Sequence, residues 1–292
     1  MTPDELCTSD TWSPLTAAST HSQLAGVLGG FLITAIALLF DRNSREAVHI
    51  LALFSSAVLI LMLGSFLFSL ISGNRAPDGA DRDAVCAISW TQTALSTGML
   101  AAGTTALFGG LGWMLAAHAV SRAGSADVDD VAAYSFLADL GGWLTFAAAM
   151  ASTLILSETT VDYLRFMYDR SPSTGLLAVI TAAAALAVLV EFRFVYVRTR
   201  ELRRSLATSG EETRLALRPI KVAGTGLNGR AVAAGWLALS APRLPREWMT
   251  EPGLGVVGVV VVLSFVVPVF VATAICHSVA STDVRRVRLR SR

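Results

Sequence analysis

Two charged residues lie where the sequence is otherwise apolar, and their side chains are the ones most able to do chemistry. Asp139 lies eight residues into the apolar stretch 131–156, and Arg230 lies eight residues into the stretch 222–241. At a rise of about 1.5 Å per residue, each would lie about 12 Å from the same side of a membrane. A charged group in hydrocarbon is costly and normally pairs with an opposite charge or serves a function. We therefore expect Asp139 and Arg230 to form an intramembrane pair or to line one polar cavity, and structural pairing is the preferred interpretation.

Gln92 is the third polar candidate, and it lies in the stretch 86–117, which contains no Lys, Arg, Asp or Glu. Small residues recur at every fourth position on two faces of this stretch, and such faces let helix backbones approach closely in lipid. The two sets are Ala94, Gly98, Ala102, Ala106, Gly110 and Thr93, Thr97, Ala101, Thr105, Gly109. We therefore expect a central packing helix, in which Gln92 could hydrogen bond to a neighbouring helix.

The elements that position these residues are predicted to be membrane-spanning helices. Of the 292 residues only 15% are charged, whereas a soluble domain usually has about 25%. Apolar stretches of roughly 20 residues can cross a bilayer. The predicted spans are residues 22–40, 47–71, 87–117, 131–156, 174–197, 222–241 and 254–279. The sequence thus predicts an all-α, polytopic bundle with a transmembrane domain over residues 22–280.

The distribution of arginine predicts how the helices are oriented. Short cytoplasmic loops collect Lys and Arg, and the two richest clusters follow the fifth span and form the tail 281–292. Both clusters can be cytoplasmic only if an even number of spans separates them, which requires 222–241 to cross. We therefore expect seven spans, an extracellular N-terminal arm over residues 1–21 and a basic cytoplasmic tail. Six spans, with 222–241 lying in the interface, is the alternative.

The same orientation places Cys7 and Cys86 together on the oxidising side of the membrane. A disulfide between them could tether the arm to the central helix, and two free thiols are the alternative. Glu191 and Arg193 lie near the inner end of the fifth span. They are interpreted as interfacial anchors, because long side chains can reach the membrane surface from there.

Catalytic, cofactor and metal motifs are not evident. Residues 224–229 form a GxGxxG, which binds dinucleotides when it joins a strand to a helix. Because no alternating strand pattern accompanies it, we interpret the glycines as easing helix approach or forming a re-entrant turn. No histidine has a second ligand at metal-binding spacing. We therefore expect no catalytic residue, no cofactor and no metal, and we do not expect an enzyme.

The functions that agree with these features are those of integral membrane proteins. A channel or small-solute or ion transporter component is one hypothesis, and it depends on Asp139, Arg230 and the polar central helix. A non-catalytic scaffold or anchor for a partner protein is the alternative, and it depends on the small-residue faces and the arginine-rich segment after the fifth span. The expected surroundings are the lipid bilayer of a bacterial plasma membrane, with a homo-oligomer or membrane partner contacting the small-residue faces. No feature indicates nucleic-acid binding.

Overall fold

The computed structural model consists of helices and the turns between them, and no strand occurs in the residues that it describes. These are residues 7–8, 12–40, 45–74, 82–123, 128–168, 173–207, 218–245, 247–250 and 253–278. The predicted tail, residues 281–292, lies outside the described residues. The all-α fold predicted from the sequence is confirmed.

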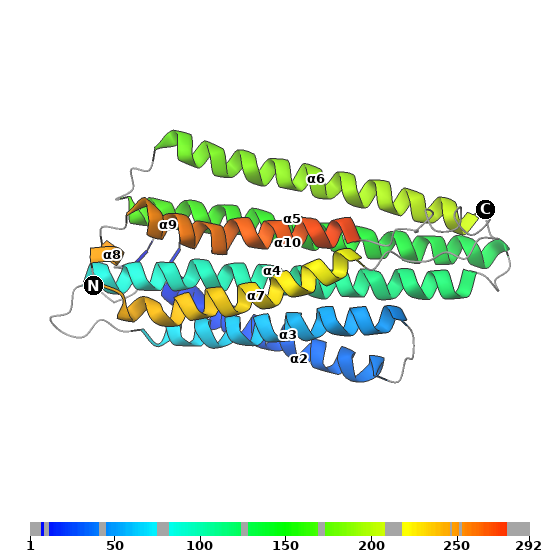
Figure 1. The fold of residues 1–292 in the computed structure, drawn as a ribbon, viewed down its shortest axis with the longest axis horizontal. Coiled ribbons are helices and arrows are strands. Elements are labelled where there is room, and N and C mark those ends of the chain that lie inside the picture. The colour runs from blue at the N-terminus through cyan, green and yellow to red at the C-terminus, as the bar shows by residue number, and fades with distance from the viewer. Residues whose placement is uncertain are drawn as a thin grey trace.

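The long helices lie side by side along one axis (Figure 1). The first six are α2 (Pro14–Leu39), α3 (Arg45–Ser72), α4 (Arg82–Ala123), α5 (Val128–Met167), α6 (Thr174–Ala207) and α7 (Arg218–Ser240). Two short pieces follow, η1 (Ala241–Arg243) and α8 (Glu247–Thr250). The last helix runs without a break through α9 (Leu254–Val261), the π-helix η2 (Val262–Val266) and α10 (Val267–Ser278).

Six helices are long and apolar enough to cross a membrane, namely α2 to α6 and the last helix. Large apolar side chains such as Phe31, Leu38 and Phe270 are exposed on the surface of the bundle, where lipid would solvate them. The chain is therefore a multi-pass helical membrane protein. In α4, 67% of the most apolar window is buried, against 17–50% in the other five. This difference confirms that residues 86–117 belong to the central helix.

Helix α7 is not among these six, because glycine, Asn228 and Arg230 lower its hydropathy. Its 23 residues would measure about 35 Å, which is enough to cross a hydrocarbon core of about 30 Å. It packs against α3, α4 and α10 within the bundle (Figure 1). Residues 224–229 lie inside this continuous helix, so the strand and turn of a dinucleotide-binding fingerprint are not present there. Whether α7 crosses the membrane stays a prediction.

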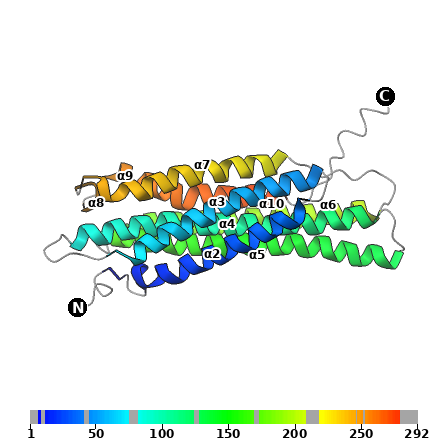
Figure 2. The same cartoon turned by 90° about the horizontal axis from the view of Figure 1, so that it is seen from below.

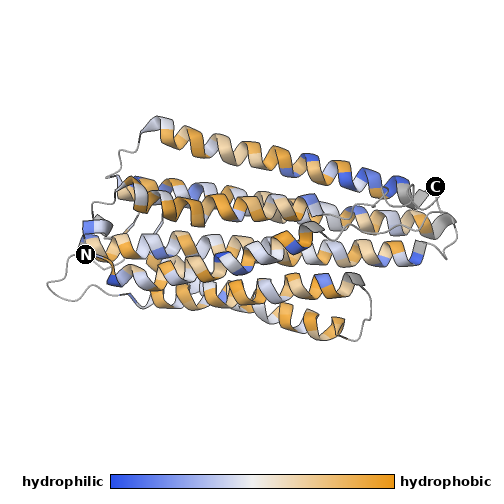
Figure 3. Cartoon of the chain, in the orientation of Figure 1, coloured by the Kyte–Doolittle hydropathy of each residue, from blue (hydrophilic) through white to orange (hydrophobic). Residues whose placement is uncertain are grey.

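The two ends of the bundle differ in character, and we name them by their residues. Cys7 lies at the disulfide end and Arg203 at the opposite, arginine end, where hydrophilic residues of α6 gather (Figure 3). With 42 and 40 residues, α4 and α5 would each measure about 60 Å. Together with α6 they extend past α7 and α10 at the arginine end (Figures 1 and 2).

The first helix begins earlier than the predicted span. Helix α2 starts at Pro14, and the side chain of Ser13 caps it by accepting a hydrogen bond from the backbone N of Thr16 (3.5 Å). Proline is well placed in a first helical turn, because its missing N–H has no partner there in any case. Part of the segment assigned to an extracellular arm, residues 1–21, is therefore helical.

Small residues of α4 let neighbouring helices approach closely. A Cβ on Gly112 would lie 2.5 Å from the carbonyl oxygen of Gly141, and a Cβ on Gly141 would lie 2.8 Å from that of Gly112. The backbones of α4 and α5 thus touch at this crossing. Gly110 faces the ring of Phe54 on α3, and Gly109 faces Ile275 on α10. Helices of the same chain therefore cover the small-residue faces of α4.

Candidate functional site

Arg230 is the buried charge at the middle of the bundle. It lies roughly 15 Å or more from either end of α7, at a rise of about 1.5 Å per residue, and only 3% of its surface is exposed. Its Nε donates a hydrogen bond to the carbonyl oxygen of Leu263 (3.1 Å). Its Nη1 and Nη2 atoms are buried and have no hydrogen-bond partner among the described residues.

The π-helix η2 explains why a backbone carbonyl is free to accept from Arg230. In an α-helix the oxygen of Leu263 would accept from the N–H of Val267, but that N–H bonds to Val262 instead. The next residue is Pro268, which has no N–H to offer. The oxygen of Leu263 therefore lacks both of the donors nearest to it along its own helix, and the guanidinium of Arg230 supplies one.

Gly98 is the residue of α4 that faces this arginine. A Cβ at this position would meet Nη2 of Arg230, and it would lie 2.7 Å from the carbonyl oxygen and 3.2 Å from the Cα of Ser264. Only glycine lets α4, the arginine of α7 and η2 meet at one point. Buried hydroxyls that lack a hydrogen-bond partner among the described residues occur elsewhere on α4 and on η2, and they include those of Thr93, Ser96, Thr97 and Ser264.

Asp139 does not pair with Arg230, and the predicted intramembrane pair is not formed. Its carboxylate is bonded to the guanidinium of Arg203 on α6, whose side chain is 65% exposed. The reason is the packing of the helices: α5 packs against α4, α6 and α10, whereas α7, which carries Arg230, packs against α3, α4 and α10. Asp139 therefore faces Arg203 on α6, at the arginine end.

Gln92 is also separate from Arg230. Its Nε2 donates to the carbonyl oxygen of Ala238 on α7 (3.0 Å), and its Oε1 accepts from Nδ2 of Asn74 (3.2 Å). It lies roughly 9 Å along α4 from Gly98, towards the disulfide end, at about 1.5 Å per residue. The interhelical bonding predicted for Gln92 is thus observed, and Gln92 joins α4 to α7 and to the end of α3.

Glu191 is a fully buried ionisable residue, although its place near the end of the fifth predicted span suggested an interfacial one. None of its surface is exposed, so its interpretation as an interfacial anchor is wrong. Its Oε1 accepts hydrogen bonds from Thr153 on α5 and Thr273 on α10, both at 3.4 Å, and its Oε2 has no partner among the described residues. The available signal was that Glu191 is the only acid in the stretch 174–197.

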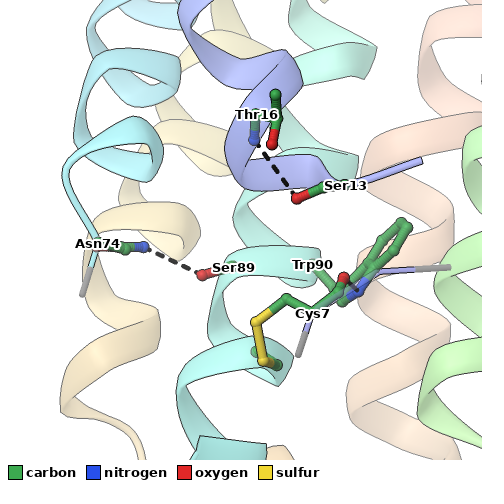
Figure 4. Close-up of a disulfide and its surroundings, with 7 residues drawn as sticks. Cys7, Ser13, Thr16, Asn74, Ser89 and Trp90 are labelled. Carbon is green, nitrogen blue, oxygen red and sulfur yellow. Dashed lines mark hydrogen bonds between the residues drawn. A yellow bond between two sulfur atoms is a disulfide. The ribbon is translucent and has the colours of Figure 1, made fainter. Parts of the chain in front are cut away.

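The disulfide end is held together by the segment that precedes α2. Cys7 and Cys86 form a disulfide, with their Cα atoms 5.1 Å apart. Nε1 of Trp90 donates to the carbonyl oxygen of Cys7 (3.1 Å), beside the disulfide shown in Figure 4. Trp12 packs edge-on against Trp90 and donates to Oδ2 of Asp162 on α5 (2.7 Å). These contacts hold Cys7 and Trp12 against the ends of α4 and α5.

The candidate site is therefore a single buried guanidinium in the middle of the bundle, which meets Gly98 of α4 and the backbone of Leu263 and Ser264 on η2. No group of three or more His, Cys, Asp or Glu that could hold a metal ion occurs in the described part of the chain. No protein-family model matches the sequence, and neither a curated protein nor a solved structure matches it significantly.

Proposed function

We propose that the protein is a channel or transporter component, and that its solute passes Arg230 at the middle of the bundle. The observation that carries this proposal is the guanidinium itself, which is buried at mid-depth without an opposite charge among the described residues. An arginine that served only to hold helices together would be expected to have an acidic partner, because burying an uncompensated charge costs several kcal/mol.

The helices that meet at Arg230 support a transport role. A π-helix inside an α-helix is frequent at functional sites, and η2 contributes both Leu263 and Ser264. Glycine and proline within membrane helices often mark the solute sites of transporters. Here α7 carries the glycines of residues 224–229 together with Arg230, and the last helix carries Pro268 two residues after η2. These parts of the two continuous helices meet where Arg230 donates to Leu263.

A scaffold or anchor for a partner protein is the second candidate. It is supported by the arginine end, where α4, α5 and α6 extend past α7 and α10 and expose arginines such as Arg200 (Figure 1). The small-residue faces of α4 are covered by helices of the same chain. An oligomer or partner contact would therefore use a different small-residue face, such as the exposed face of α2 that contains Gly30. The disulfide suits the outer side of a bacterial plasma membrane, where oxidising conditions preserve such bonds.

The transport proposal can be tested in proteoliposomes by stopped-flow light scattering. After a hyperosmotic step with a permeant solute, vesicles shrink and then swell again as that solute enters. We expect faster swelling with the protein than with empty vesicles for at least one salt or small neutral solute, and loss of this effect in Arg230→Met. The control variant Arg200→Gln changes an exposed arginine of α6 and should keep the flux. Flux that equals that of empty vesicles for all solutes, or that survives in Arg230→Met, contradicts the proposal.

A further inference from the structure

We propose that Arg230 binds a small monovalent anion, with Ser264 as a second donor to it. This inference rests on the proposed function and deepens it, since it names the chemical class of solute for the same site. The ligand would be a halide, nitrate or a carboxylate group held between α4, α7 and η2.

The first argument is charge. A guanidinium keeps its proton at neutral pH, so Arg230 brings a full positive charge into the bundle. The buried acids of the described residues are Asp139 and Glu191. Asp139 forms its ion pair with Arg203, and Glu191 contacts the hydroxyls of Thr153 and Thr273. Neither acid forms an ion pair with Arg230 in the described structure. A bound anion would provide the missing negative charge.

The second argument is the balance of donors and acceptors. Nη1 and Nη2 of Arg230 carry N–H groups that can only donate, and neither atom has an acceptor within the described part of the chain. Ser264 Oγ is also buried without a partner among the described residues, and the backbone of Ser264 lies beside Gly98, as Nη2 does. The one carbonyl shown to accept from the arginine, that of Leu263, is occupied by Nε. A site with surplus donors and a positive charge selects a ligand that accepts hydrogen bonds and is negative.

The shape and charge of the guanidinium favour a small monovalent anion. Its planar fork matches the two oxygens of a carboxylate or nitrate. One monovalent anion would also balance the single positive charge of Arg230.

The test is an anion titration of the purified full-length protein in detergent. Sodium chloride, nitrate or acetate replaces sodium gluconate at constant ionic strength, and the thermal unfolding temperature is measured. A ligand that binds only the folded protein raises this temperature in a saturable manner. We expect a rise of several degrees for the wild type and none for Arg230→Met. We expect apparent affinity to fall about tenfold in Ser264→Ala, as for the loss of one hydrogen bond to a charged group.

Two controls keep the result specific. Ser56→Ala removes a buried hydroxyl that is already bonded to Ala52 within its own helix, so its anion response should equal that of the wild type. Replacing sodium by potassium should have no effect. If Arg230→Met does not fold, the line width of the ³⁵Cl magnetic resonance signal provides the second measurement. Wild-type protein should broaden this signal, and nitrate should narrow it again by competition.

A wild-type protein that neither responds to these anions nor broadens the chloride signal would overturn the inference. So would an Arg230→Met variant with the full response. These failures are distinguishable from failure of the transport proposal. Anion binding without any flux would refute the transport proposal but support the anion site. Flux of neutral solutes without an anion response would refute anion binding at Arg230 but support the transport proposal.

Discussion

Replacing Gly112 by alanine should force α4 and α5 apart at their crossing. The new Cβ would lie 2.5 Å from the carbonyl oxygen of Gly141 and 2.5 Å from Oγ1 of Thr145. Ordinary contact for a Cβ begins at 3.4 Å, so about 0.9 Å (3.4 − 2.5) of clearance is missing. The oxygen belongs to the backbone and cannot rotate away, and Thr145 is held by its hydrogen bond to the same oxygen (2.8 Å).

We expect Gly112→Ala to lower the free energy of unfolding by about 1–3 kcal/mol, the usual cost of adding a methyl group to a packed core. The matched control is Gly30→Ala on α2, where a new Cβ would meet nothing within 4 Å. That variant should be neutral, or more stable by about 0.5–1 kcal/mol, because alanine is the better helix former. Unfolding of the purified variants in increasing fractions of sodium dodecyl sulfate measures both values. Equal stability of the two variants would refute the close crossing of α4 and α5.

Two further predictions concern the disulfide end and α7. The double variant Cys7→Ala/Cys86→Ala should lose about 2–4 kcal/mol of stability, because the bond closes a long loop. Cys276→Ala, which removes a buried thiol outside the disulfide, should lose less. Mass spectrometry after alkylation without reductant should modify Cys276 alone once the protein is denatured, and alkylation of all three cysteines would contradict the bond. Topology reporters fused after Ala207 and after Arg243 should report opposite sides of the membrane; the same side for both would place α7 in the interface.

Much of the helical architecture can be predicted from the sequence because the bilayer limits what an apolar segment can do. A run of about 20 apolar residues without strand partners must be helical to satisfy its own backbone, which is why each of the six candidate spans in the structure overlaps a predicted span. The small residues of 86–117 also indicated the central helix, since close approach needs small side chains. The joint position of Cys7 and Cys86 at one end followed from counting the crossings between them.

The pairing of charges could not be predicted in this way. Residue numbers give an approximate depth along a helix, but they do not show that α5 packs against α6 whereas α7 packs against α3, α4 and α10. Nor does periodicity show which neighbour a helix face meets. Glu191 points between α5 and α10, which only the packing of α6 decides.

The sequence by itself determined that this chain is a bundle of membrane helices in which one segment, residues 222–241, is less hydrophobic than the others. It could do so because hydropathy and length are local properties of a segment. The tertiary structure alone decided that Arg230 meets a carbonyl freed by the π-helix before Pro268, and that Asp139 meets Arg203 instead. The physical reason is that the partner of a side chain depends on the rotation and axial offset of whole helices. These are set by contacts such as that of Gly112 with Gly141, which lie far apart in the chain.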